Sequence, residues 1–280
     1  MVVLLGLASA LLYGSGDFLG GMASRRAHVL TVLTLVETAG VIAALAVATA
    51  SSGPASLAGL AWGFSAGLVG GLGLIIFYAG LAAGPMNVVA PVSGLVSTVL
   101  PVAVALAEGE RPGAGVYAGA LLCLVAIVLA SSAGDAGPAH PGRLGRAIAY
   151  GTASGASFGL FFLLIRNAGQ SGEVWPVAAG RIGELATVLA AAAVLRPGLP
   201  RGIGGRLQLA AAGAGVIDVV ANICYVAATR TGAFGLAVVL ASLYPGVTVL
   251  LARVVLGERL RWIQRIGLGL AAVGIVLVAA

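Results

Sequence analysis

The sequence predicts an all-α integral membrane protein with ten transmembrane helices, and three observations predict this fold class. Of the 280 residues, 60% are hydrophobic and 9% are charged, whereas an ordinary soluble domain carries roughly 25% charged residues. The mean hydropathy is +1.10. Uninterrupted apolar stretches follow one another along the chain, each close to the roughly 20 residues that a helix needs to cross a bilayer. Lipid is therefore the expected solvent for most of this chain.

Helices are predicted for these stretches because the apolar residues run continuously, whereas strands of a membrane barrel would alternate over about ten residues. A helix also satisfies its backbone hydrogen bonds within its own segment, as the bilayer interior requires. The first stretch begins without a basic region and continues to Met22, which is typical of a span more than of a cleaved leader. The predicted spans are 2–22, 29–50, 57–82, 87–107, 113–131, 145–166, 174–195, 206–229, 234–256 and 262–280.

Matching segments indicate that the chain is an internal repeat. Gly109-Glu110-Arg111 and Gly257-Glu258-Arg259 lie 148 positions apart, each after a predicted span. Glu37 and Glu184 lie 147 positions apart, each within the second span of its half. Phe77-Tyr78-Ala79 and Cys224-Tyr225-Val226 also lie 147 positions apart. Because each half holds five helices, an odd number, the second copy is expected to be inverted across the membrane, as in secondary transporters whose site lies between the copies.

The charge pattern excludes several classes of protein. The net charge is +6 and all fifteen basic residues are arginine, but they stand between the apolar stretches, where membrane insertion places basic residues. Nucleic-acid binding is therefore not expected. Cys123 and Cys224 lie in apolar segments, and His28 and His140 are far from them in sequence, so no metal site is predicted. No nucleotide-binding motif is present, and no cofactor is expected.

Five ionisable residues lie well inside the predicted spans, where each unpaired charge would cost about 2.5–3.5 kcal/mol. They are Asp17, Glu37, Arg181, Glu184 and Asp218. We expect them to face one another or a central water-accessible cavity.

Helical spacing places further polar residues beside these charges. Asp218, Asn222 and Tyr225 are spaced i, i+4, i+7, which puts them on one stripe of a helix. Tyr13 stands one turn before Asp17. Arg181 and Glu184, at i and i+3, are placed to form an ion pair.

These stripes suggest roles in transport. A buried carboxyl group can exchange a proton near neutral pH, so Asp17, Glu37, Glu184 and Asp218 are candidates for proton coupling. Arg181 could hold a carboxylate or phosphate of a substrate. The residues proposed to orient the substrate are Tyr13, Tyr78, Asn222 and Tyr225.

Structural interpretations of the same residues stay open. Arg181 and Glu184 can simply neutralise each other, and Asp17 can lie at the membrane face beside Arg25 or Arg26. Tyr78 and Tyr225 suit packing equally well. Glu110 and Glu258 are expected to cap the helices that follow them, and Arg166 to reach the interface at the end of its span. The glycines of the third and eighth spans predict close helix packing, and Pro245 predicts a kink.

The tail of each half resembles the EamA-type members of the drug/metabolite transporter superfamily. The motif runs from Ser242-Leu243-Tyr244-Pro245 through an apolar run to Gly257-Glu258-Arg259, followed by a glycine-rich helix. In the first half, Ser97 stands where the repeat would place the matching proline. The resemblance implies EamA-like five-helix repeats at 1–133 and 145–280, joined by a linker at 134–144, and a family that handles amino acids, sugars, nucleotide derivatives, drugs and other metabolites.

The leading hypothesis is therefore a multi-pass secondary transporter of the cell membrane, bacterial inner or plasma membrane, that exports a small organic metabolite or drug. Its expected partners are that substrate, membrane lipids and protons, and it is expected to act as a monomer or homodimer. A flippase for a lipid-linked substrate, or a flippase subunit, is the alternative. An enzyme is not expected, because no catalytic cluster is visible. The arginine distribution places both termini outside, whereas the family resemblance implies that both are cytoplasmic.

Overall fold

The computed structural model describes residues 1–24, 26–51, 53–83, 86–131, 141–169, 174–195, 204–256 and 261–279. These residues form eleven helices and contain no β-strand. The helices are α1 (Val2–Ser24), α2 (Val29–Ala50), α3 (Leu57–Ala83), α4 (Met86–Ala107), α5 (Ala114–Ser131), α6 (Pro141–Gly169), α7 (Val174–Leu195), α8 (Gly205–Thr231), α9 (Phe234–Ala241), α10 (Tyr244–Leu256) and α11 (Trp262–Ala279).

Nine of the ten predicted spans correspond to one helix each, and the ninth is divided. The prediction of one helix over 234–256 is wrong, because α9 ends at Ala241 and α10 begins at Tyr244. Pro245 has no amide hydrogen to donate to the carbonyl group four residues earlier, on Ala241, so the hydrogen-bond ladder is interrupted there. The predicted kink at Pro245 is therefore found as a break in the helix. In addition, α6 begins at Pro141, inside the stretch expected to be a linker.

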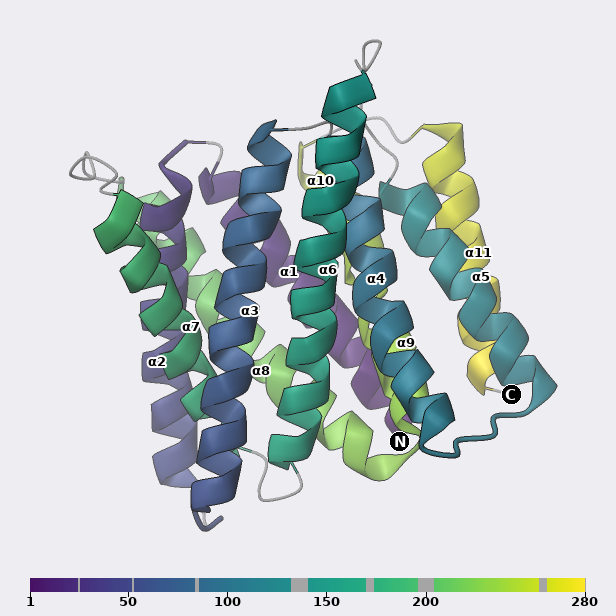
Figure 1. Ribbon diagram of the computed structural model, residues 1–280, viewed down its shortest axis with the longest axis horizontal. Helices are drawn as coiled ribbons and strands as arrows, with labels where there is room; N and C mark the ends of the chain where they lie inside the picture. Colours follow the sequence, from purple (N-terminus) through teal and green to yellow (C-terminus); the bar gives the residue numbers. More distant parts are fainter. Residues whose placement is uncertain are drawn as a thin grey trace.

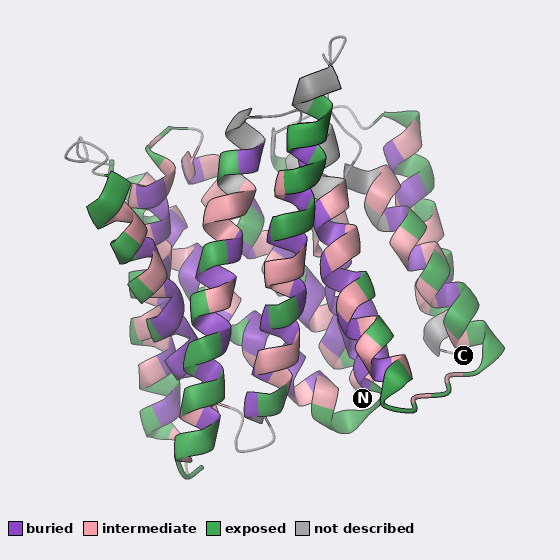
Figure 2. Cartoon of the chain, in the orientation of Figure 1, coloured by how far each residue is buried: buried purple, intermediate pink, exposed green. Residues whose placement is uncertain are grey.

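Six of these helices are long and apolar enough to cross a membrane within the described residues, namely α1, α2, α3, α6, α7 and α8. Shorter apolar helices occupy the positions of the other four predicted spans. The exposed side chains on the outer faces of the bundle include many large apolar residues, among them Leu4, Ile42, Leu195, Leu209 and Val254 (Figure 2). Such an exterior suits lipid as the surrounding solvent.

Helices of the two halves pack against one another (Figure 1). In the middle of the bundle, α3 packs against α6 and α7, α8 packs against α1 and α2, and α2 contacts α7. At one side, α5 packs against α11. The start of α1 and the end of α11 lie toward the same end of the bundle (Figure 1), as expected for an even number of crossings.

Glycines bring the helices close at two of these contacts. A methyl group on Gly67 of α3 would overlap the carbonyl oxygen of Gly180 of α7, and one on Gly183 would overlap that of Phe64. On the other side, a methyl group on Gly215 of α8 would overlap the carbonyl oxygen of Val36 of α2. The close packing predicted from glycines therefore occurs inside the bundle, where small residues let backbones approach.

Candidate functional site

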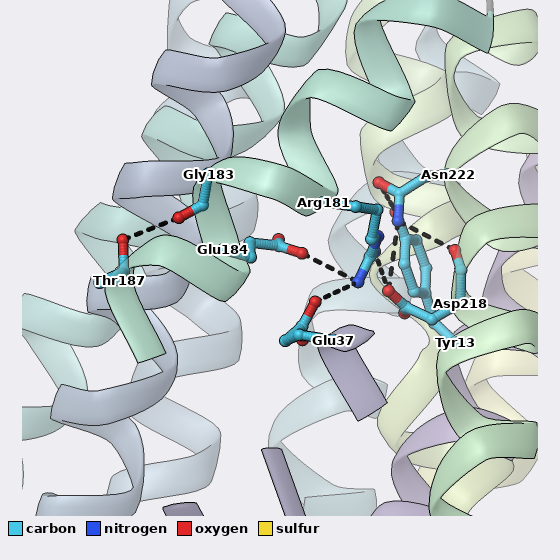
Figure 3. Close-up of polar contacts among 8 residues, drawn as sticks. All are labelled: Tyr13, Glu37, Arg181, Gly183, Glu184, Thr187, Asp218 and Asn222. Carbon is cyan, nitrogen blue, oxygen red and sulfur yellow. Dashed lines mark hydrogen bonds and ion pairs between the residues drawn. The ribbon is translucent and has the colours of Figure 1, made fainter. Parts of the chain in front are cut away.

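Arg181 is the centre of an ion-pair cluster to which α2, α7 and α8 contribute (Figure 3). Its Nη1 lies 3.1 Å from Oε2 of Glu37 on α2 and 2.8 Å from Oε2 of Glu184, one turn along α7. Its Nη2 pairs with Oδ2 of Asp218 on α8. The expected pair between Arg181 and Glu184 is thus present, and two further carboxylates join it.

The cluster is buried but unevenly so. The side chains of Glu37, Arg181 and Glu184 are 2%, 5% and 7% exposed, whereas that of Asp218 is 22% exposed. Asp218 is therefore the member of the cluster that water or a solute reaches most easily. With all four groups ionised, three carboxylates face one guanidinium, so the cluster holds more negative than positive charge. In a medium of low polarity such a surplus is costly, and it favours binding of a proton or another cation.

A chain of hydrogen bonds extends the cluster to α1. Asn222 donates from Nδ2 to the Asp218 carbonyl oxygen at 2.9 Å and lies 3.3 Å from Asp218 Oδ2. The hydroxyl of Tyr13 donates to Oδ1 of Asn222 at 2.8 Å. Asn222 is buried, and hydrogen bonds hold both the Nδ2 and the Oδ1 atom of its amide. The predicted stripe from Asp218 to Asn222 and the tyrosine of the first span therefore meet.

Three glycines that were not among the predicted site residues make room for these side chains. A methyl group on Gly40 of α2 would lie 3.1 Å from Cδ of Arg181. On α3, a methyl group on Gly70 would lie 2.9 Å from Oε1 of Glu184, and Gly71 faces Glu184 and Thr187. In the sequence, only the spacing of Gly40 three residues after Glu37 indicates that this glycine faces the cluster. The sequence does not show which side chain fills the space beside it.

Two other predicted site residues, Asp17 and Tyr225, take part in none of these ion pairs. Asp17 is exposed on α1 and takes part in none of the ion pairs found among the described residues. Tyr225 is fully buried, and its ring packs at a tilt against that of Phe162 of α6, with the centroids 4.8 Å apart. Its hydroxyl donates to the Phe162 carbonyl oxygen at 3.4 Å. Tyr78 lies in α3, but its side chain is outside the described part of the structure.

Tyr244 was not predicted as a site residue, although its sequence motif was noted. Its ring meets that of Tyr13 edge to face, with centroids 6.3 Å apart. Tyr244 is the first residue of α10. The break between α9 and α10 therefore lies beside Tyr13, the residue that extends the Arg181 cluster to α1. No group of three or more His, Cys, Asp or Glu side chains suited to a metal ion occurs in the described parts of the chain.

Comparison with known proteins gives a family and a fold. Residues 145–280 match the model of the EamA-like transporter family. A crystal structure of another protein has the same fold, with a TM-score of 0.80 and 18% sequence identity, and the similarity covers 99% of this chain and 95% of that chain. No curated protein matches the chain.

The apolar helices indicate a multi-pass membrane protein. The family match indicates the transporter class, because the members of that family are transporters. The second half of the chain, residues 145–280, thus matches the EamA-like transporter family, in agreement with the resemblance seen in its sequence.

Proposed function

We propose that this protein is a secondary transporter that exports a small organic metabolite or drug in exchange for protons, with the Arg181 cluster as its proton-exchanging site. The observation that carries the proposal is the surplus of buried carboxylates. Glu37, Glu184 and Asp218 all contact Arg181, which can balance one negative charge. Protons can balance the rest, and they leave when the cluster opens to water at higher pH.

Because three carboxylates already surround Arg181, we assign it the role of holding the acids, in place of the anion-binding role first considered. Asp218, the most exposed of the three acids, is the proposed entry point. Tyr13 and Asn222 connect it to α1 through hydrogen bonds, and substrate binding beside them is part of the proposal. If substrate and proton bind in competition, an inward proton gradient drives export, since binding of one ligand weakens binding of the other by the same factor.

Alternating access by two inverted repeats is the proposed mechanism. The contacts support it: α3 of the first half packs on α6 and α7, and α8, its counterpart, packs on α1 and α2. The same exchange of partners would result from a two-fold axis in the membrane plane. We accordingly propose repeats at 1–133 and 145–280, with the Arg181 cluster at their interface.

Burial of the cluster favours a solute over a lipid as the substrate. Glu37, Arg181 and Glu184 are enclosed by α2, α7 and α8, whereas a flippase would present its polar groups along a groove open to lipid. We place the protein in the bacterial inner membrane or plasma membrane, as a monomer or homodimer.

The test begins with metabolite profiling of cells with and without the protein, to find a solute that the protein depletes from the cytoplasm. That solute is then offered to proteoliposomes across an imposed pH gradient. We expect gradient-driven transport by the native protein and loss of the gradient dependence in the Glu184→Gln and Asp218→Asn variants.

Thr34→Val provides the matched control, because Thr34 shares a face of α2 with Glu37 and its hydroxyl bonds to the carbonyl of Leu30 in its own helix at 2.7 Å. This variant should keep the gradient dependence. Proton-driven transport that survives in Glu37→Gln, Glu184→Gln and Asp218→Asn would refute the coupling site. Depletion of a lipid in place of a solute would support the flippase.

A further inference from the structure

Glu110 caps a helix of the other half of the protein. Its Oε1 accepts a hydrogen bond from the backbone N–H of Phe234 at 2.7 Å, and its Oε2 accepts one from Gly235 at 3.2 Å. These are the first two N–H groups of α9, whose own N-cap residue, Ala233, supplies no side-chain bond. A carboxylate suits such a helix start, which has unpaired N–H groups and partial positive charge. Glu110 therefore has a structural capping role, as expected, but it caps α9 and not the helix that follows it in sequence.

A glycine-dependent turn aims Glu110 at α9. Gly109 has φ of 100°, a conformation that favours glycine. Its N–H donates to the carbonyl of Leu106 at 3.1 Å, and the N–H of Glu110 donates to that of Ala105 at 3.0 Å. This pair of bonds is the Schellman arrangement that ends a helix. The Gly109-Glu110 dipeptide thus ends α4 and directs the carboxylate across the interface between halves.

A second contact joins the same helix ends. Arg166, near the end of α6, pairs with Glu108 at 2.6 Å, and its guanidinium carbon lies 4.1 Å from the centre of the Phe234 ring. Phe234 itself is 2% exposed. Glu108 and Glu110 come from the first half, and Arg166 and Phe234 come from the second. From the sequence, Arg166 was expected only to reach the membrane interface. Its contacts with Glu108 and Phe234 were not predicted.

We propose that Glu110 is a gate residue that holds the start of α9 against the end of α4 while this end of the transporter is closed. Opening of this end requires its release. The ends of α4 and α6 and the start of α9 lie toward the end of the bundle where α1 begins (Figure 1). Ala105 is buried directly beneath the contact, 3.3 Å from where a methyl group on Gly235 would lie. The inference rests on the alternating access proposed above.

The character of the contact suits a reversible closure. The side chains of Arg166 and Glu108 are 21% and 49% exposed, so water can replace their bonds when they separate. By contrast, Gly67 and Gly183 bring the backbones of α3 and α7 into direct contact, with no ion pair between the two glycines. In addition, α9 has eight residues and ends at the break before Tyr244, so it can move without bending a long helix.

The experiment measures the accessibility of a single cysteine beneath the gate. Cys123 and Cys224, the free cysteines of the described structure, are replaced by alanine, and Ala105→Cys is introduced as the reporter. Ala211→Cys, equally buried at the start of α8 toward the opposite end, is the matched reporter. The labelling rate by N-ethylmaleimide is measured in nanodiscs with Glu110 intact and with Glu110→Gln.

We expect Glu110→Gln to raise the labelling rate of Ala105→Cys about tenfold, in keeping with loss of one charged helix cap, and to leave that of Ala211→Cys unchanged. Arg111→Gln is the control variant. Arg111 neighbours Glu110 but donates to the carbonyls of Leu106 and Glu110 in its own segment, so its loss should change neither rate.

Two results would overturn the gate. An unchanged rate at Ala105→Cys would show that Glu110 does not control access, and an equal rise at both reporters would show general destabilisation by loss of a structural cap. The labelling needs no substrate and no proton gradient. A failure of the gate is therefore distinguishable from a failure of proton-coupled export, which is measured as transport in the native protein.

Discussion

Arg181 is the shared counter-charge of three acids that reach it from α2, α7 and α8, and it can neutralise only one of them. Its removal differs in kind from the removal of any one acid. Without Arg181, the carboxylates would be buried with no counter-charge, which is the costly way to break a buried ion pair. Without one acid, Arg181 still has two partners and the surplus of negative charge becomes smaller.

At the residue scale we therefore expect Arg181→Gln to lower the free energy of unfolding by about 3–5 kcal/mol. The loss should be greater at high pH and smaller at low pH, because protonation of the acids removes the uncompensated charge. Thermal unfolding of the purified protein across a pH series checks this. A loss of stability that grows as the pH falls would contradict the charge balance described for the cluster.

Glu37→Gln should be far less harmful, with a change in the free energy of unfolding within about 1.5 kcal/mol. The amide keeps a hydrogen-bond acceptor for Arg181, and Glu184 and Asp218 remain as counter-charges. The measurement is the same thermal unfolding, with Arg181→Gln in parallel. Equal destabilisation by the two variants would mean that the carboxylates do not exceed the charge that Arg181 needs.

At the scale of the elements, glycine faces set the distance between helices and so the space for the charged side chains. The contact of Gly67 with Gly180 holds α3 against α7, while Gly70 and Gly71 on the same helix leave room for Glu184 and Thr187. One turn of α3 thus packs against the backbone of α7, and the next turn makes room for the side chains of α7. A larger residue in this stretch would separate α3 from α7, the helix that carries Arg181 and Glu184.

Gly67→Ala is expected to lower the free energy of unfolding by about 1–3 kcal/mol, because the added methyl group overlaps backbone and cannot be accommodated by a side-chain rotation. Gly213→Ala in α8 is the matched control, since a methyl group there meets no atom within 4 Å. It should be neutral or stabilising by up to about 1 kcal/mol. If the two variants unfold at the same temperature, close packing of α3 on α7 is not a source of stability.

At the scale of the whole molecule, the ten predicted crossings would place both termini on one side of the membrane. The start of α1 and the end of α11 lie toward the same end of the bundle (Figure 1), although four of the apolar helices are short within the described residues. The arginine distribution predicts that both termini lie outside the cell, whereas the family resemblance implies that both lie in the cytoplasm.

Reporters fused separately to the N-terminus and the C-terminus are therefore expected to be active on the same side of the membrane. A reporter that is active only in the cytoplasm, paired with one that is active only outside it, makes the measurement at each end. Activity on opposite sides would show that one apolar helix does not cross. Cytoplasmic activity at both ends would favour the family expectation over the arginine distribution.

The sequence by itself determined the lipid-facing composition, nine of the ten predicted helices, a kink at Pro245 and the resemblance to the family. It also named the four ionisable residues of the charged cluster, although it added Asp17, which takes part in none of the described ion pairs. These follow from local properties, namely apolar length, a missing amide hydrogen and the spacing of residues on one helix. The pair of Arg181 with Glu184 needs only one turn of α7, and the stripe from Asp218 to Asn222 only one turn of α8.

Only the tertiary structure decided which stripes meet. Glu37 reaches Arg181 across 144 positions of sequence, and Glu110 reaches Phe234 across 124. Spacing within a helix gives the direction of a side chain but not which helix lies opposite. That choice depends on how glycine faces, apolar surfaces and buried charges of all the helices are satisfied together. Tyr225 and Asp218 lie on the same predicted stripe of α8 but meet different neighbours. Tyr225 packs against Phe162, whereas Asp218 pairs with Arg181 and is the most exposed member of the cluster.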